Sequence, residues 1–191
     1  MRFTLKEDEW VLDFLNTAEW YFIYELPGLA SGEGFSDEVK KVLFPPPIVD
    51  KEGKPVSTEE TEDWEEFVLP DIEDGFARDR AVVSLDIDAA EKTENPEEWF
   101  EEDDEVPEVM PDGPMWRVVV DMDHTEQWYS TLNQTRIMMN KAHGLADDDA
   151  RFFMSLFGPD NSPVSQEKAL LLAQYEFYCV IQNVLVENLM N

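Results

Sequence analysis

Apolar residues recur at helical spacing from the start of the chain. Residues 2–5, RFTL, are expected to form a short strand. Thr4 and Glu7 have the spacing of a capping box, which predicts that a helix begins there. Apolar positions then continue until Pro27-Gly28, at Val11, Leu12, Phe14, Leu15, Ala18, Phe22 and Leu26. The pattern therefore predicts a first helix over roughly residues 5–26.

The middle of the chain predicts more helix between proline-rich connections. Ser36 is expected to cap a short helix that ends at Pro45-Pro46-Pro47, where the chain must be extended. Residues 61–93 predict one or two helices, broken or kinked near Pro70. Their shared apolar face is expected to contain Phe67, Ile72, Phe76, Val83, Ile87 and Ala90.

The second half contains the clearest strand pattern of the sequence. Residues 116–121, WRVVVD, combine three valines with a tryptophan and predict a strand. Asp123 and Glu126 form a cap-like pair, so a helix is expected to begin at residue 124. Its inward face is expected to contain Trp128, Leu132, Thr135, Met139 and Ala142. Gly144 occupies the position where a left-handed residue ends a helix.

The last part of the chain predicts two further helices. Asp147 is expected to open a short helix that runs to Phe157. Ser162-Pro163 then starts the final helix, which runs to about Met190. This helix is apolar almost all round, and such a helix belongs in the middle of a bundle.

These elements predict a mainly α fold. We expect a helical bundle around a central C-terminal helix, with a small two-stranded antiparallel sheet that pairs residues 2–5 with residues 116–121. The chain has 191 residues, which fits a single domain, 1–191. Prolines rule out regular structure through most of residues 94–115, so an acidic loop or partly disordered insertion is expected there.

Net charge excludes several classes of partner. The sequence has 44 acidic and 14 basic residues, a formal charge of −30. This charge repels nucleic-acid phosphates and anionic lipids, so neither direct nucleic-acid binding nor membrane binding is expected. A basic surface on another protein remains a possible partner. Solubility alone, or an acidic or salty habitat, would explain the same charge.

Cysteine usage and the N-terminus favour the cytoplasm. Cys179 is the single cysteine, and it lies in an apolar stretch, as expected for a buried thiol in a reducing compartment. The first ten residues carry charges where the apolar core of a secretory signal would be. The apolar stretch 169–190 includes glutamines and glutamates that would be costly in lipid.

The most acidic stretch suggests a docking site. Residues 97–109, EEWFEEDDEVPEV, contain eight carboxylates around two adjacent aromatic residues. A partner-binding site is predicted at Trp99, Phe100, Glu101, Glu102, Asp103, Asp104 and Glu105. In the alternative, both aromatic side chains fold back onto the core and fasten a solvated loop.

The sequence contains only weak candidates for a catalytic or metal-binding motif. Asp121, Asp123 and His124 could hold a divalent metal, although Asp123 has the position of a helix cap and no further ligand stands out. Asn133 and Arg136 lie one helical turn apart in an otherwise apolar helix, and Arg78 and Arg80 are rare basic residues in an acidic stretch. These arginines are expected to pair with carboxylates that hold helices together, and in the alternative some of them bind an anionic ligand. No phosphate loop, paired-cysteine zinc spacing or nucleophile elbow occurs in the sequence. We therefore assign no catalytic residue, cofactor or metal.

The order of these segments resembles a known family. The strongest matches are the segment TEQWYSTLNQTRIMMNKAHGL, with Trp128, Asn133 and Arg136, and the final helix around Tyr175 and Gln182. The pattern resembles the bacterial family catalogued as domain of unknown function 2017. The resemblance implies no established activity and no site residues. Its members in actinobacteria often lie beside the adaptor of the Clp protease, which suggests protein quality control or regulation.

Three functions follow from these observations. The first is a non-enzymatic protein-interaction or regulatory module with an acidic docking surface. The second is a nucleic-acid mimic that inhibits a DNA-binding protein, which needs carboxylates on a rigid face. The third is a metal-dependent enzyme that uses Asp121, Asp123 and His124.

Overall fold

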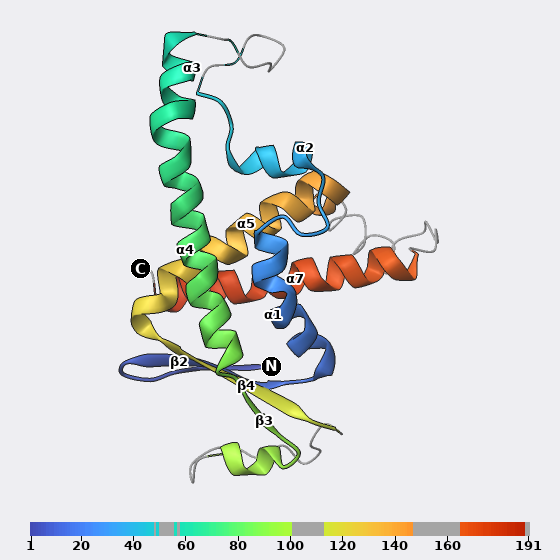
Figure 1. The fold of residues 1–191 in the computed structure, drawn as a ribbon. Coiled ribbons are helices and arrows are strands. Elements are labelled where there is room, and N and C mark those ends of the chain that lie inside the picture. Colours follow the sequence, from blue (N-terminus) through green and yellow to red (C-terminus); the bar gives the residue numbers. More distant parts are fainter. Residues whose placement is uncertain (48, 50–55, 57, 101–112, 147–164, 190–191) are drawn as a thin grey trace.

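The computed structural model describes residues 1–47, 49, 56, 58–100, 113–146 and 165–189. The strands are β1 (Arg2–Leu5), β2 (Glu9–Leu15), β3 (Glu91–Thr93) and β4 (Met115–Asp121). The α-helices are α1 (Thr17–Ala30), α2 (Asp37–Lys40), α3 (Glu59–Asp63), α4 (Leu69–Asp88), α5 (Thr125–His143) and α7 (Gln166–Leu189). Short turns of 3₁₀ helix are η1 (Lys41–Leu43), η3 (Pro96–Trp99) and η4 (Met122–His124), and η2 (Trp64–Val68) is a π-helical turn. The fold is mainly helical, as predicted (Figure 1).

The sheet has four antiparallel strands in the order β1-β2-β4-β3. The predicted pairing of residues 2–5 with residues 116–121 is wrong, because β2 lies between these two strands. β1 and β2 form a hairpin, in which Arg2 is opposite Asp13 and Leu5 is opposite Trp10. The inner face of the sheet contributes Trp10, Leu12, Val118 and Val120 to the core.

The predicted first helix is also wrong over its first half. Residues 9–15 form β2, and α1 begins at Thr17. The capping box that opens this helix is Asn16 with Glu19, whose side chains each accept a hydrogen bond from the other residue's backbone N–H. Thr4 instead belongs to β1. α1 then continues past Pro27, and Ser31 caps its end.

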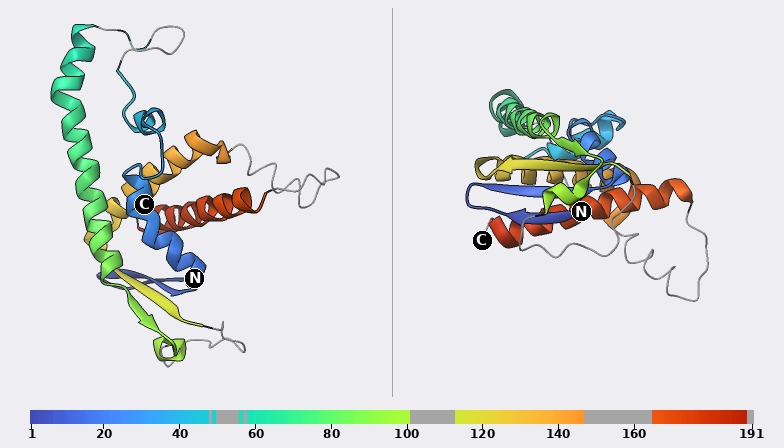
Figure 2. Two further views of the ribbon diagram at one scale, coloured as in Figure 1. Left: turned by 45° about the vertical axis from the view of Figure 1, so that its right-hand side comes forward. Right: turned by 90° about the horizontal axis from the view of Figure 1, so that it is seen from below.

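The helices form layers beside the sheet. α5 packs against α4 on one side and against α7 on the other, and α1 contacts all three (Figures 1 and 2). The centre of the described fold is therefore α5, and the expectation of a central C-terminal helix is wrong. The α5 side chains Trp128, Leu132 and Met139 are buried, as predicted, and Gly144 ends the helix with a φ of 64°.

One long helix projects beyond the rest of the described chain. α3, η2 and α4 follow one another without a break from residue 59 to residue 88, which corresponds to about 45 Å of helix. The lower half of α4 packs on α5 and α1, whereas α3 and η2 extend away from the sheet and the other helices (Figure 1). The predicted break near Pro70 is a π turn within a continuous helix.

Candidate functional site

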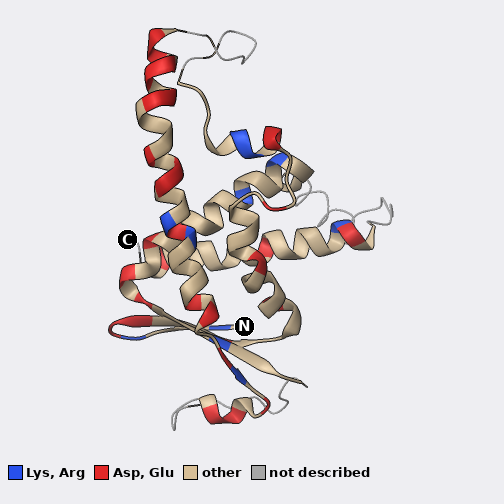
Figure 3. Ribbon diagram, in the orientation of Figure 1, with Lys and Arg blue, Asp and Glu red and all other residues tan. Residues whose placement is uncertain are grey.

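The projecting helix carries an unbroken acidic surface. Residues 59–77 contain nine carboxylates and no lysine or arginine. All nine side chains are exposed: Glu59, Glu60, Glu62, Asp63, Glu65, Glu66, Asp71, Glu73 and Asp74. Figure 3 shows this part of the helix with acidic segments and no basic one. We call these nine residues, together with Phe67 and Val68, the acidic helix surface.

Two apolar side chains stand out on this surface. Phe67 is 63% exposed and Val68 is 44% exposed. Phe67 had been expected to face the core with Val83 and Ile87, which are indeed buried. The prediction failed at Phe67 because, among the described residues, no other helix packs against this part of the helix (Figure 1). An exposed aromatic residue among carboxylates is typical of a binding surface.

The π turn explains how the helix passes Pro70. Proline has no N–H to donate, and its ring clashes with the carbonyl group four residues earlier, here that of Glu66. The backbone N–H of Leu69 donates to the carbonyl group of Trp64, five residues before it. This wider turn accommodates the proline without breaking the helix. Single π turns occur often at functional sites.

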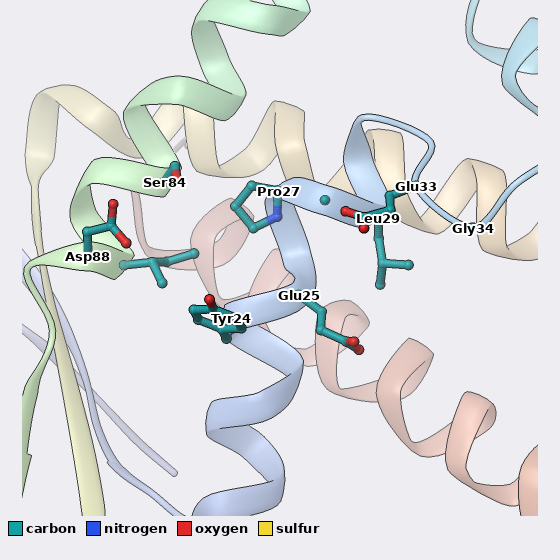
Figure 4. Close-up of a pocket in the computed structure, with 10 residues that line it drawn as sticks. Tyr24, Glu25, Pro27, Leu29, Glu33, Gly34, Ser84 and Asp88 are labelled. Atoms are coloured by element: carbon teal, nitrogen blue, oxygen red, sulfur yellow. The ribbon is translucent and has the colours of Figure 1, made fainter.

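A pocket of about 530 Å³ lies between α1 and α4. Figure 4 shows Ser84 and Asp88 on α4 facing Tyr24 and Pro27 on α1. Glu25 lies on the other side of α1, where Gln174 of α7 donates to its carboxylate at 3.4 Å. The pocket's acidic groups therefore do not converge on one point. Among the residues that the structure describes, no three His, Cys, Asp or Glu side chains are grouped to hold a metal ion.

A second cluster joins the outer face of the sheet to the predicted docking segment. Asp13 is 1% exposed, and its carboxylate accepts hydrogen bonds from Arg2 at 3.0 Å and from Arg117 at 3.3 Å. Both guanidinium groups also donate to the backbone carbonyl group of Trp99. This network explains how an acid can be buried in a sheet, because a buried carboxylate needs charged hydrogen-bond partners.

The structure places the two predicted aromatic anchors, Trp99 and Phe100, within this cluster. The Arg117 guanidinium lies 4.6 Å from the centre of the Trp99 ring, and Phe100 lies 4.8 Å from Phe14, centre to centre. Phe14 has a φ of 54° where the pairing of β2 with β4 is irregular. Both anchors are half-buried. The rest of the predicted docking site, Glu101, Glu102, Asp103, Asp104 and Glu105, lies outside the described residues.

Asp121, Asp123 and His124 each have another role in the structure. The side chain of Asp121, rather than Asp123, caps the turn, because it accepts from the backbone N–H of Asp123 at 2.9 Å. The imidazole Nδ1 of His124 lies 3.0 Å from the carboxylate of Asp86, which also accepts from the indole of Trp128 at 2.8 Å. His124 thus connects the start of α5 to α4, whereas Asp121 and the backbone N–H of Asp123 form only a local turn after β4.

Two of the three arginines join helices, but through glutamine amides rather than the expected carboxylates, and Arg78 donates to the backbone carbonyl group of Asp74 within its own helix. Arg80 of α4 donates to Gln134 of α5 at 2.7 Å, and burial lowers the pKa of this guanidinium. Arg136 of α5 donates to Gln182 of α7 and lies over the ring of Tyr175. These contacts tie α5 to helices on both sides. The helix expected from Asp147 to Phe157 lies outside the described residues.

The fold and these surfaces define a mainly helical protein with a small antiparallel sheet and a strongly acidic projecting helix. The profile of the family described as Domain of unknown function (DUF2017) matches residues 16–189, and the chain belongs to this family. The match begins directly after β2 and confirms the resemblance seen in the sequence. No curated protein and no solved structure matches the chain.

Proposed function

We propose that this protein is a non-enzymatic interaction module of the cytoplasm, and that its acidic helix surface docks a basic, amphipathic segment of another protein. One observation carries the proposal: Phe67 and Val68 are exposed among nine exposed carboxylates on a helix that projects from the fold. A partner with lysine or arginine around an apolar stripe would match both features. Complementary charge also accelerates association.

The acidic helix surface suits the docking of an amphipathic helix of the partner. An amphipathic helix is commonly recognised through its apolar face, with charged residues on either side. Phe67 and Val68 would contact the apolar stripe, while Glu62, Glu65 and Glu66 would pair with basic side chains. The predicted site at Trp99, Phe100 and Glu101–Glu105 stays a prediction and is tested separately below.

Nucleic-acid mimicry is the second candidate, because the structure supplies a continuous helix that displays nine exposed carboxylates. The exposed Phe67 argues for the docking of a protein segment instead, since a phosphate backbone presents no apolar group. Replacing Phe67 distinguishes the two functions. A mimic would bind its target equally well with alanine there, whereas a docking surface would lose affinity.

Binding of a synthetic helical peptide made of lysine and leucine tests the proposal. The first variant combines Glu62→Gln, Glu65→Gln and Glu66→Gln, and its control combines Glu7→Gln, Glu38→Gln and Glu126→Gln, which lie outside both candidate docking sites. All six residues are exposed, so both variants lose the same charge. We expect the helix variant to bind about tenfold more weakly, from roughly 0.5 kcal/mol per pair, and the control to change little.

A second pair of variants tests the apolar anchor. Phe67→Ala should weaken peptide binding, whereas Leu85→Ala, at a 68% exposed position near the other end of the same helix, should not. Affinity for the wild-type protein should fall as salt rises. Equal losses in the helix variant and its charge-matched control would show that net charge alone attracts the peptide, and the proposed site would then be wrong. The double variant Trp99→Ala/Phe100→Ala tests the alternative site in the same assay.

A further inference from the structure

The outer face of α7 is apolar although it is exposed. α7 is the one helix in the described part of the chain with the length and apolar composition of a membrane span, yet only 39% of that window is buried in the protein. One face packs on α5 and α1 through Tyr178, Ile181 and Leu185, which are buried. On the opposite face, Leu170 is 56% exposed and Val180 is 46% exposed. Figure 2 shows α7 along the side of the molecule opposite α4.

The exposed apolar residues form a regular seam. Leu170, Ala173, Phe177, Val180 and Val184 follow one another at alternating intervals of three and four residues. Ala173 is exposed, whereas Phe177 and Val184 are half-buried. This spacing keeps the five side chains on one side of a helix, as in the contact seam between paired helices. Phe177 is partly covered because it also packs against Phe22, with ring centres 5.8 Å apart.

The seam is almost symmetrical about Phe177. Leu170 lies seven residues before it and Val184 seven residues after it, while Ala173 and Val180 lie four before and three after. An identical helix running in the opposite direction would therefore bring Leu170 opposite Val184 and the small Ala173 opposite Val180. A twofold interface uses the same patch on both subunits, so a self-complementary seam of this kind fits it.

Charge favours a second copy over a basic partner at this face. Residues 169–186 contain a single charged residue, Glu176, in a chain of net charge −30. A basic segment would find little to attract it here. Two copies could approach by this face with less repulsion than elsewhere, because their acidic helices lie on the far side (Figures 2 and 3). We infer that α7 pairs with α7 of a second copy of this chain in an antiparallel, twofold arrangement.

The contact area that two α7 helices can share suggests a weak dimer. Two helices of 24 residues, about 36 Å long, can share only part of one face. Such a contact falls at or below the lower end of stable interfaces. The dimer should therefore dissociate on dilution. Its salt dependence should be opposite to that of a basic partner, because salt screens the repulsion between two acidic chains. Because salt should weaken the binding of a basic partner and strengthen the dimer, failure of the docking proposal can be distinguished from failure of the dimer proposal.

Sedimentation of the full chain over a range of concentrations tests the inference. We expect a monomer–dimer equilibrium that shifts toward the dimer as salt rises. Val180→Glu should abolish the dimer, and Leu85→Glu, which adds the same charge at an exposed position on α4, should leave it intact. Circular dichroism checks that both variants fold. A chain that stays monomeric at every concentration and salt level would overturn the inference.

Cross-linking tests the direction of the helices. In a background in which the native cysteine is removed by Cys179→Ser, a mixture of the single variants Ala173→Cys and Val180→Cys should form more disulfide-linked dimer than either variant alone, because these positions meet across the twofold axis. No excess of the mixed dimer would overturn the antiparallel arrangement. A third outcome would also overturn the inference. If the wild-type protein forms no dimer but binds neutral phospholipid vesicles, and if Val180→Glu abolishes that binding, the seam contacts lipid rather than a second copy.

Discussion

Asp13 shows how a single residue organises one face of the sheet. Its buried carboxylate is shared by Arg2 on β1 and Arg117 on β4, so it links both neighbours of β2. The same two arginines fix the backbone at Trp99, which begins the predicted docking segment. One carboxylate thus determines how the sheet and the segment after β3 fit together.

Asp13→Asn should destabilise the protein by about 3–5 kcal/mol, because it leaves two partly buried guanidinium groups without their shared charge. Urea unfolding followed by tryptophan fluorescence measures the loss. Asp37→Asn is the control, since Asp37 pairs with Lys40 at an exposed position and should matter by less than about 1 kcal/mol. Equal stability of Asp13→Asn and the wild type would show that the network contributes nothing.

Tyr178 gives the protein a sensitivity to alkaline pH. Its hydroxyl group donates to the carbonyl group of Phe22 at 2.7 Å, and burial raises its pKa. Above about pH 10 the unfolded chain ionises at this tyrosine while the folded chain does not, so stability should fall as pH rises further. Urea unfolding across this range should show a shallower decline in Tyr178→Phe.

Tyr21→Phe is the matched control for this prediction. Tyr21 is exposed, and its pKa is raised mainly by its hydrogen bond to Glu25 and by the charge of that carboxylate. Its removal should change the alkaline decline less than removal of Tyr178. The same slope in wild type and Tyr178→Phe would contradict the assignment of the alkaline loss to this buried hydroxyl group.

At the scale of the element, β2 shows what the sequence could not reveal. Residues 10–13 are all buried, so the strand lacks the alternation of exposed and buried positions by which a strand is recognised. The irregular pairing at Phe14 disturbs the alternation further. The apolar spacing therefore predicts one helix over residues 5–26, where the structure has the strand β2 followed by the helix α1. β4, α2 and α5 were predicted correctly because the valines of β4, the Ser36 cap of α2 and Gly144 at the end of α5 act locally, although the cap expected at Asp123 is provided by Asp121.

The candidate site was predicted only in its general character. The net charge indicated an acidic surface, but the docking site was expected at residues 97–109 rather than on the projecting helix, and the spacing of Phe67 predicted that it faces the core. Spacing identifies the face of a helix on which a residue lies, but not whether another element covers that face. Phe67 and Leu170 are exposed because their faces lack a neighbour in the described fold, which is a property of the tertiary structure.

The capping box of α1 offers a test at the same scale. Asn16→Ala removes the side-chain oxygen that accepts from the N–H groups of Ala18 and Glu19, so we expect a loss of about 1 kcal/mol in thermal or urea unfolding. Ser36 caps a helix of only four residues, so Ser36→Ala should reduce the stability of the protein by less than Asn16→Ala. If both substitutions were neutral, α1 would owe its position to packing alone.

At the scale of the molecule, charge separates two surfaces. The projecting helix is acidic and faces away from the fold, whereas the outer face of α7 is nearly neutral (Figure 3). The first surface fits a basic partner and the second a copy of the same chain. Neither proposal needs the other, because the two surfaces lie on different sides of α5 (Figure 2).

The net charge should also make stability depend on salt. Repulsion among the carboxylates of a chain with charge −30 destabilises the compact state, and salt screens it. The melting temperature should rise with sodium chloride, by about 2–4 °C for each kcal/mol gained in a chain of this size. Potassium chloride should raise the melting temperature to a similar extent. The protein should be kept dilute so that dimer formation does not contribute to the change. A constant or falling melting temperature would contradict this account.

Hydrogen exchange of the backbone amides, with and without the lysine–leucine peptide, tests the central claim most directly. The account predicts that the peptide slows exchange mainly along residues 59–76, and that this protection is lost in Phe67→Ala. Protection confined to residues 94–109, or spread evenly over the acidic parts of the chain, would contradict the claim that the projecting helix is the docking surface.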